Sequence, residues 1–183
     1  MEIITEKEMV KTVEDGIKNR SLYAIIQHEN NSVNYGVDEK PNFECCKEKN
    51  IICYDVHRRG GAIYTQAGDV AVAYITTFID TPFGERFTDD LVEYLVNKGL
   101  NAERVGNDIL VDGYKVYGWG SNYIAEYNCV LVAIQISLSV NLDIIKEVCI
   151  KPMVKEPRGL NEWGITRDDI MQFIYQFNNK YGY

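Results

Sequence analysis

The stretch from Gly106 to Gly118, GNDILVDGYKVYG, limits the fold of this chain more than any other. Its Asp112-Gly113 dipeptide is favoured in two-residue type I′ turns, because both central residues of that turn need φ > 0. A turn there sets four pairs opposite each other: Val111 and Tyr114, Leu110 and Lys115, Ile109 and Val116, Asp108 and Tyr117. Strand alternation then creates a face that we expect to be buried, with Ile109, Val111, Tyr114 and Val116. The other face, directed to a cleft or to solvent, holds Asp108, Leu110, Lys115 and Tyr117.

Lys115 has two interpretations at this point. A strand lysine is most often a solubilising edge residue. The alternative is a positive charge held on a rigid platform for an anion. Asp108 lies diagonally across the hairpin on the same face, at the ~7–8 Å spacing of such neighbours. The two residues form either a plain cross-strand ion pair or a site in which the carboxylate keeps the ammonium charged and aimed.

The charge balance argues against two classes of partner. The chain has 27 acidic and 19 basic residues and a net charge of −8, whereas proteins that bind nucleic acid use Lys and Arg to neutralise phosphates. Anionic membrane surfaces are disfavoured for the same reason, and no apolar run approaches the ~20 residues of a membrane span. The start, MEIITEKEMV, lacks the basic and apolar regions of a signal peptide. We therefore expect a cytoplasmic protein that binds neither nucleic acid nor membrane.

The order of elements predicts one domain over residues 1–183, because no repeat or linker marks a boundary. Helices are expected over 5–18, from a cap at Thr88 to Gly99, over Leu142–Cys149, and from Thr166, where Asp169 completes a capping-box variant. Strands are expected over Ser21–His28, Asn50–Val56, Ala62–Phe78 with a break near Gly68, and Cys129–Val140, while Asn30–Cys46 is expected to be a loop. The sum is an α+β fold with an antiparallel or mixed sheet, helices on one face and an open cleft on the other.

A second candidate site is the run His57-Arg58-Arg59-Gly60-Gly61-Ala62, between two expected strands. Consecutive glycines let backbone N–H groups approach a phosphate or carboxylate, and adjacent guanidinium groups add bidentate charge. The same residues also fit an ordinary β-turn with solvated arginines.

The cysteines give a third candidate. Five cysteines without CxxC spacing, together with two histidines, argue against a zinc site and fit free thiols in the cytoplasm. Cys149 is followed by Lys151 and Pro152, and a nearby lysine favours a thiolate nucleophile. The alternative is an inert residue at a helix end. Neither histidine has a visible Ser or Cys partner, so no catalytic triad is expected.

Taken in order, these segments resemble the lipoate/octanoate and biotin protein ligase superfamily. The likeness covers Tyr35 to roughly Ile174 and includes YGVDEKPNFECC, RRGGAIYTQAGDVAVAYI, the hairpin, and VLVAIQISLSVNLD. Glu39 stands where the family usually has glutamine. The lipoate branch fits better than the biotin branch, whose loop has a longer glycine–arginine run followed by tryptophan. The resemblance implies a class II synthetase-like catalytic domain, here without a C-terminal accessory domain.

The resemblance also implies site residues and ligands. Lys115 occupies the place of the family's catalytic lysine. Binding of the acyl group and adenylate is implied for Arg58, Arg59, Gly60, Gly61, Ala62, Tyr64, Asn107, Asp108 and Gly118. The implied ligands are ATP, Mg²⁺, and lipoic or octanoic acid as the small-molecule acyl acid, and the implied partner is a lipoyl-type carrier domain. No metal ligand is assigned.

Several departures from the family pattern keep three functions open. The arginines precede only two glycines, Thr65-Gln66 replaces a usual His-Asp pair, and the usual His-Gly pair is replaced near Ala133-Ile134. The first function is an ATP-dependent lipoate or octanoate protein ligase. The second is an octanoyl or lipoyl transferase of the same fold that works without ATP, with Cys149 as acyl acceptor. The third is a non-catalytic protein that binds an acyl or adenylate ligand or a carrier domain.

Overall fold

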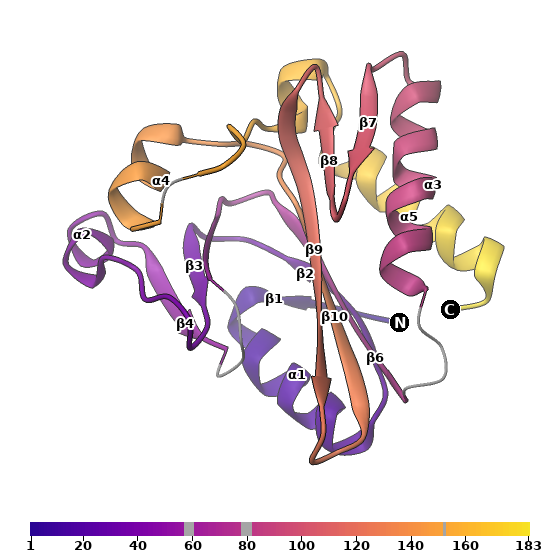
Figure 1. Ribbon diagram of the computed structural model, residues 1–183, viewed down its shortest axis with the longest axis horizontal. Coiled ribbons are helices and arrows are strands. Elements are labelled where there is room, and N and C mark those ends of the chain that lie inside the picture. Colours follow the sequence, from indigo (N-terminus) through magenta and orange to yellow (C-terminus); the bar gives the residue numbers. More distant parts are fainter. Residues whose placement is uncertain (57–60, 78–81, 152) are drawn as a thin grey trace.

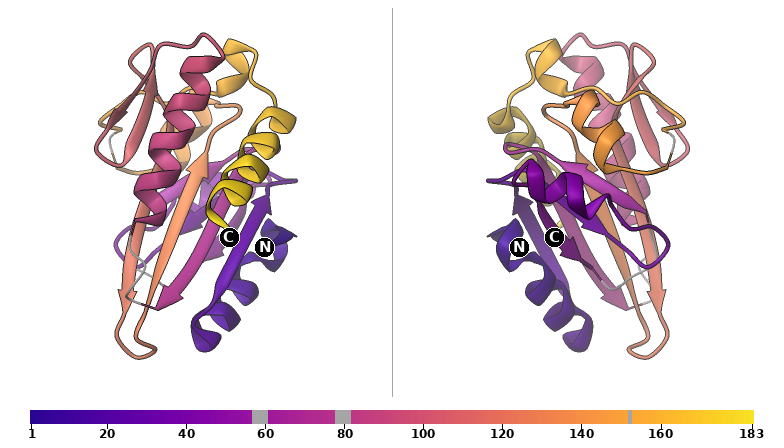
Figure 2. Two further views of the ribbon diagram at one scale, coloured as in Figure 1. Left: turned by 90° about the vertical axis from the view of Figure 1, so that its right-hand side faces the viewer. Right: turned by 90° about the vertical axis from the view of Figure 1, so that its left-hand side faces the viewer.

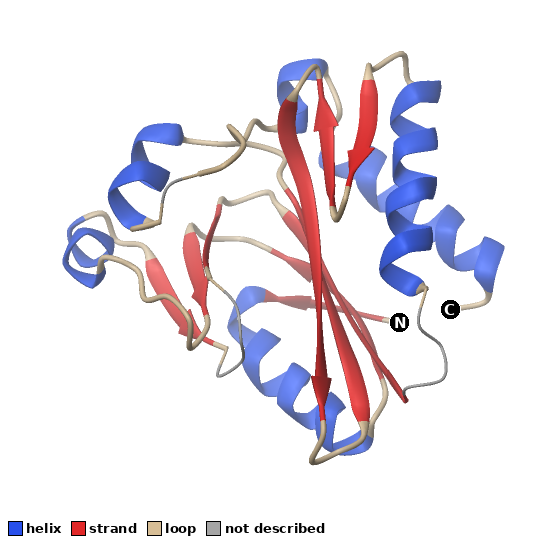
Figure 3. Ribbon diagram, viewed as in Figure 1, coloured by secondary structure: helices blue, strands red, loops and turns tan. Residues whose placement is uncertain are grey.

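A mixed sheet forms the centre of the molecule (Figures 1 and 3). The computed structural model describes residues 1–56, 61–77, 82–151 and 153–183. Among these residues the sheet has seven strands, in the order β1-β2-β6-β10-β9-β8-β7. The strands are β1 (Glu2–Thr5), β2 (Leu22–Gln27), β6 (Val70–Thr77), β7 (Ala102–Val105), β8 (Asp108–Val111), β9 (Tyr114–Ile124) and β10 (Cys129–Ile136). Only β1 and β2 pair in parallel within this described sheet, so the predicted α+β class with a mixed sheet is confirmed.

A second, smaller sheet has the described strand order β4-β3-β5 and is formed by β3 (Ser32–Tyr35), β4 (Ile52–Asp55) and β5 (Ala62–Thr65). Two short helices, α2 (Phe43–Glu48) and α4 (Leu142–Val148), share an apolar cluster with it. The prediction of a loop over Asn30–Cys46 is therefore wrong, because β3 and the first four residues of α2 lie inside it. The segment was not predicted as a strand because it is rich in polar residues. One of them, Ser32, is nevertheless fully buried, and its hydroxyl forms a hydrogen bond with Thr65 Oγ1 at 2.7 Å.

Helices cover both faces of the large sheet. The main core lies on one face under α3 (Phe83–Asn97) and α5 (Arg167–Tyr181), which lie side by side in the left view of Figure 2. The opposite face of β2 and β6 packs against α1 (Glu6–Asn19). The expectation that all helices lie on one face is wrong, because β2 and β6 are apolar on both faces and need cover on each. A short 3₁₀ helix (Leu160–Trp163) leads to α5, whose predicted Thr166–Asp169 capping box is confirmed.

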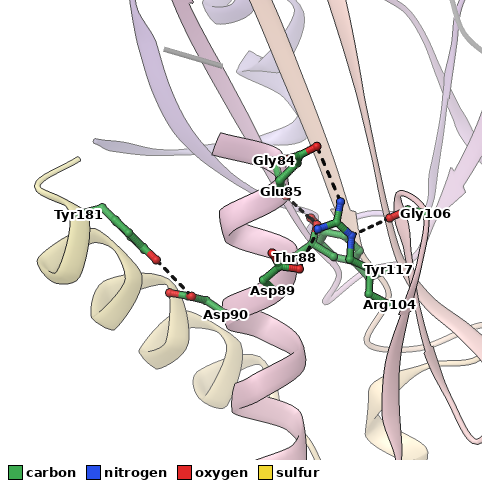
Figure 4. Close-up of polar contacts among 9 residues, drawn as sticks. All are labelled: Gly84, Glu85, Thr88, Asp89, Asp90, Arg104, Gly106, Tyr117 and Tyr181. Carbon is green, nitrogen blue, oxygen red and sulfur yellow. Dashed lines mark hydrogen bonds and ion pairs between the residues drawn. The ribbon is translucent and has the colours of Figure 1, made fainter. Parts of the chain in front are cut away.

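Helix α3 begins six residues, or more than one and a half turns, earlier than the sequence indicated. Its cap residue is Pro82, whereas Thr88 lies inside the helix and is fully buried. The Thr88 hydroxyl donates to the carbonyl of Gly84 at 2.6 Å and lies 3.0 Å from the Tyr117 hydroxyl (Figure 4). The predicted cap at Thr88 is therefore wrong; its side chain instead joins α3 to β9. The predicted stop at Gly99 is confirmed by a φ of 90°.

Within the described ranges, none of the helices is both long and apolar enough to span a bilayer.

Candidate functional site

The hairpin between β8 and β9 presents Lys115 as the sequence predicted. Asp112 and Gly113 have φ values of 51° and 83°, both in the left-handed region that a type I′ turn needs. Leu110 pairs with Lys115 and Val111 pairs with Tyr114, as predicted. Because the turn is tight, the backbone of Lys115 is fixed only two residues from it.

Further along, a β-bulge changes the register. Ile109 pairs with Tyr117 and Asp108 with Gly118, so the predicted Ile109–Val116 and Asp108–Tyr117 pairs are wrong. The extra residue on β9 brings both Val116 and Tyr117 into the main core, each 1% exposed. The predicted open position of the Tyr117 side chain is therefore wrong: the residue borders the cavity, but its side chain is buried, and burial raises the pKa of its hydroxyl. Leu110, expected on the same open face, is also buried.

A cavity of about 860 Å³ lies over the side of the sheet that carries Lys115. One part of its wall is apolar and comes from α1 and the sheet, through Met9, Val10, Val13, Ile26, Ala71, Ala73 and Leu131. Polar and charged residues line another part, which includes the group of Lys115, Asp108 and Lys155 beside Gly118. A cavity of this size with a few polar groups at one region is typical of small-molecule sites.

Asp108 connects two lysines in the polar part of the cavity. Its Oδ1 atom lies 2.8 Å from Lys115 Nζ, and its Oδ2 atom lies 2.8 Å from Lys155 Nζ. Burial alone would raise the pKa of Asp108, but hydrogen bonds from Lys115 and Lys155 outweigh it and leave that pKa below its ordinary value. The predicted proximity of Asp108 and Lys115 is confirmed, and the carboxylate stays ionised between them.

The absence of a side chain at Gly118 leaves space for the ion pair between Asp108 and Lys115. A Cβ atom at position 118 would come within 3.1 Å of both Asp108 Oδ1 and Lys115 Nζ. Glycine therefore lets both side chains lie across the strand. Its predicted place in the site is consistent with this geometry.

The glycine-rich run is only partly within the described residues. His57, Arg58, Arg59 and Gly60 lie outside them, whereas Gly61 and Ala62 line the cavity. The Ala62 N–H donates to Glu39 Oε2 at 3.1 Å, and the Lys151 N–H donates to Glu39 Oε1 at 3.1 Å. Glu39 is nearly buried, with 8% of its side chain exposed. In this structure, the Ala62 N–H is therefore bound to Glu39.

Tyr64 and Asn34 contribute polar atoms without partners. Both residues line the cavity, and neither Tyr64 OH nor Asn34 Oδ1 has a hydrogen-bond partner among the described residues. Burial, together with the charge of Asp69, raises the pKa of Tyr64 to about 12, so its hydroxyl is a neutral donor. Buried polar atoms usually have hydrogen-bond partners, so both atoms are available to a bound ligand. For Tyr64 this agrees with its predicted role in ligand binding.

Asp69 braces the cavity wall where β6 begins and β10 ends. It is 2% exposed and accepts N–H groups from Gln66, Leu138 and Ser139 at 3.0, 2.8 and 3.3 Å. Burial raises its pKa to about 6 despite these three donors. It was not identified from the sequence, because an aspartate after a turn glycine is common in loops.

Cys149 lines the cavity but lacks the expected activation. Its Sγ atom lies 3.7 Å from the Ala62 carbonyl, and burial followed by the charge of Glu39 raises its pKa. The Lys151 ammonium is directed instead to Glu39 and to the carbonyl of Asp38, at 3.8 and 3.4 Å. Of the two alternatives for Cys149, the structure favours the inert residue at a helix end, because the lysine that would favour a thiolate is paired elsewhere.

Asn107 is not brought to the cavity. It lies exposed in the turn between β7 and β8, where its carbonyl accepts the Trp119 N–H at 3.1 Å. Its predicted side-chain role in ligand binding has no support in this arrangement.

No metal ligand can be assigned within the described ranges, where no three His, Cys, Asp or Glu side chains are grouped for an ion. Both oxygens of Asp108 are already bound to lysines.

Lys155 and the position of Glu39 were missed at the sequence level. Lys155 lies in KPMVKEPRG, a stretch without periodicity, so no pattern connects it to Lys115. Only the path of the chain after α4 brings it there.

Residues 4–168 match the family model of the lipoyl protein ligase A/B catalytic domain. No curated protein sequence matches the chain.

Solved structures with this fold are similar over nearly the whole chain. LipL1 of P. falciparum, in complex with lipoate, has a TM-score of 0.76 at 17% identity, covering 100% of this chain and 62% of its own. A bi-partite lipoate protein ligase of Thermoplasma acidophilum, described with its E2 lipoyl domain, has a TM-score of 0.75 at 16% identity, covering 97% and 82%. A lipoate-protein ligase A bound with ATP has 0.75 at 16%, covering 98% and 82%. The chain thus spans less than two thirds of the length of LipL1, and these likenesses establish the fold.

Proposed function

The chain belongs to the lipoyl protein ligase A/B catalytic-domain family, and from this premise we propose that it is an ATP-dependent lipoate or octanoate protein ligase. The family membership agrees with the resemblance identified from the sequence. The acceptor we propose is a lysine on a lipoyl-type carrier domain. We further propose that residues 1–183 fold as one catalytic domain and that the reaction takes place in the cytoplasm.

The reaction has two steps. In the first, an acyl carboxylate oxygen attacks the α-phosphorus of ATP, and pyrophosphate leaves to give an acyl-adenylate. In the second, the ε-amine of the carrier lysine attacks the acyl carbonyl, AMP leaves, and the amine nitrogen loses a proton. Both steps place negative charge between the carbonyl and the phosphate, where a fixed ammonium stabilises it without solvent reorganisation.

One observation carries this proposal: Lys115 holds its ammonium in a cavity that is otherwise largely apolar. The apolar part, between α1 and the sheet, suits an aliphatic or dithiolane chain. The ammonium, held 2.8 Å from Asp108 Oδ1, suits the carboxylate that must react. Because the hairpin turn and Asp108 both restrain Lys115, the charge is in place before the substrate binds.

ATP and Mg²⁺ enter the proposal with different support. Arg58 and Arg59, outside the described residues, are proposed to neutralise the triphosphate, and Gly60 and Gly61 to donate N–H groups to the adenylate. The described residues offer no group of carboxylates for Mg²⁺. We therefore expect the ion to arrive on the ATP phosphates and assign it no ligand and no step.

Acyl transfer between carriers without ATP is the second candidate, and one observation favours it. The Glu39 carboxylate occupies the Ala62 N–H beside the glycine-rich run, and a negative charge there opposes a triphosphate. The raised pKa of Cys149 opposes a thioester on that residue, so this candidate would transfer the acyl group directly.

Pyrophosphate release in the presence of ATP and either lipoate or octanoate tests the proposal. We expect release to depend on the acid, and the acyl group to appear on the carrier lysine. The Cys149→Ser variant serves as the matched control and should retain this activity. Transfer from an octanoyl carrier without ATP would replace the ligase with the transferase. If calorimetry detects neither acyl acid nor nucleotide binding, both enzyme assignments are wrong.

A further inference from the structure

The chain after α4 runs along β9 beside Lys115. The Lys115 N–H donates to the Glu156 carbonyl at 2.9 Å, and the Arg158 N–H donates to the Lys115 carbonyl at 2.9 Å. Pro157 forms a parallel bridge with Lys115, and the Arg158 guanidinium lies 3.7 Å from the centre of the Tyr114 ring. Residues 156–158 are therefore fixed to the hairpin like a short added strand, and they hold the residue before them in place.

That residue is Lys155, whose ammonium faces the same carboxylate as Lys115. Lys155 Nζ lies 2.8 Å from Asp108 Oδ2 and 3.5 Å from the Val105 carbonyl. Its side chain is 27% exposed, compared with 39% for Lys115. Lys155 and Lys115 both line the cavity, so a ligand that contacts one ammonium is close to the other.

The charges of this group do not cancel. Two ammonium groups share the single carboxylate of Asp108, which leaves one positive charge among these three side chains. Lys151, the other lysine described in the cavity wall, is paired with Glu39 at 3.8 Å. Asp69 is held by backbone N–H groups, and Glu14 belongs to α1. Four carboxylates and three lysines line the described wall, so the excess of positive charge is local to Asp108, where two ammonium groups share one carboxylate.

We propose that Lys155 is a second anion-binding residue of this site, whose ammonium holds the phosphate of the acyl-adenylate together with Lys115. This inference rests on the proposed ligase function and adds a residue to it. Two ammonium groups that already hold the two oxygens of one carboxylate are placed to hold two oxygens of one phosphate. Asp108 keeps them apart and ordered beforehand, which reduces the entropy lost when the ligand binds.

Calorimetry with a charged and a neutral probe tests this role. The charged probe is a non-hydrolysable phosphonate analogue of lipoyl-AMP or octanoyl-AMP, whichever the wild type binds more tightly. The neutral probe is the corresponding acyl amide. We expect Lys155→Met to weaken binding of the phosphonate about tenfold to a hundredfold, the cost of one charged hydrogen bond, and to leave amide binding unchanged. Lys155→Arg should recover much of the loss.

Lys146→Met is the matched control, because it removes the same charge from an exposed position on α4, outside the cavity wall. It should leave the affinity for both probes unchanged. Equal weakening of both probes by Lys155→Met would show that Lys155 only ties the loop to Asp108, and would overturn the inference. An unchanged phosphonate affinity would also overturn it while the ligase proposal stands. A wild type that binds neither phosphonate would overturn both.

Discussion

At the scale of single residues, Asp108 matters as much as the lysine that it holds. The carboxylate binds Lys115 and Lys155 through separate oxygens, each at 2.8 Å. If either lysine is removed, the other still neutralises the carboxylate. Removal of one ammonium group should therefore affect ligand binding or catalysis without a large change in the stability of the protein.

Lys115→Ala should show this separation. We expect kcat/KM for acylation of the carrier to fall about a hundredfold to a thousandfold, equivalent to ~2.7–4 kcal/mol of barrier. The free energy of unfolding should change by less than about 1 kcal/mol, because the lysine is partly exposed and Asp108 keeps Lys155. Steady-state kinetics and urea denaturation measure the two quantities. A large loss of stability with intact activity would contradict the assigned role.

At the scale of elements, contacts between α3 and β9 hold the β8–β9 hairpin in place. The Tyr117 hydroxyl meets Thr88, and Arg104 of β7 pairs with Asp89 of α3 at 2.8 Å (Figure 4). Near the start of α3, Gly84 lies against the Trp119 ring. The strand that carries Lys115 is thus packed on α3 through the side chains of Tyr117 and Trp119.

Gly84→Ala tests the closeness of this contact. Alanine favours helix formation by about 1 kcal/mol over glycine, but its Cβ would lie 2.6 Å from the Trp119 ring. The indole ring is rigid and packed, so it cannot bend away from the new methyl group. Overpacking of this kind lowers the free energy of unfolding by about 1–3 kcal/mol. We expect a net loss in the free energy of unfolding, measured by urea denaturation.

The same substitution in a Trp119→Leu background is the control. Without the ring, alanine at position 84 should be neutral or stabilising, so a double-mutant cycle should give a clear coupling energy. Additive effects would contradict the proposed clash.

At the scale of the whole molecule, the cavity depends on how the small sheet joins the large one. His28, directly after β2, is fully buried, and its Nδ1 lies 3.3 Å from Thr65 Oγ1 of β5. The backbone N–H of His28 donates to the backbone carbonyl of Asp69 at 3.1 Å. The joint therefore contains two buried titratable groups whose pKa values move in opposite ways.

These shifts predict how stability responds to pH. Burial lowers the pKa of His28 to about 4, although the charge of Glu6 acts in the opposite direction. The unfolded chain therefore binds the proton more tightly, and the contribution of His28 is complete above pH ~6.5 and is lost as the pH falls toward 4. Asp69, with a pKa raised to about 6, binds its proton more tightly when folded and adds stability as the pH falls from 6 toward 4.

In the wild type, the stability lost through His28 as the pH falls from 6 to 4 should be partly offset by the stability gained through Asp69. Between pH 7 and 4, the free energy of unfolding should fall less in His28→Gln than in the wild type. The difference should be up to roughly 3 kcal/mol. Urea unfolding at several pH values measures this difference. A parallel pH dependence of the two proteins would contradict burial of a neutral histidine at the joint.

The elements that depend on neighbouring residues were predictable from the sequence. Asp112-Gly113 determines its own turn, Gly99 ends α3, and Thr166 and Asp169 cap α5 through contacts three residues apart. Lys115 and Asp108 follow from the turn and strand alternation, because both rules act over a few residues. These local rules also supported the α+β class.

The tertiary structure decided what depends on residues distant in the chain. The bulge that buries Tyr117 is set by its packing under α3, and a buried hydrogen bond between Ser32 and Thr65 makes a strand of a polar segment. Lys155 reaches Asp108 because residues 156–158 pair with β9. Patterns of neighbouring residues cannot predict such pairings. The pairings are stabilised by burial and by charge contacts between distant residues, which form only when the chain folds.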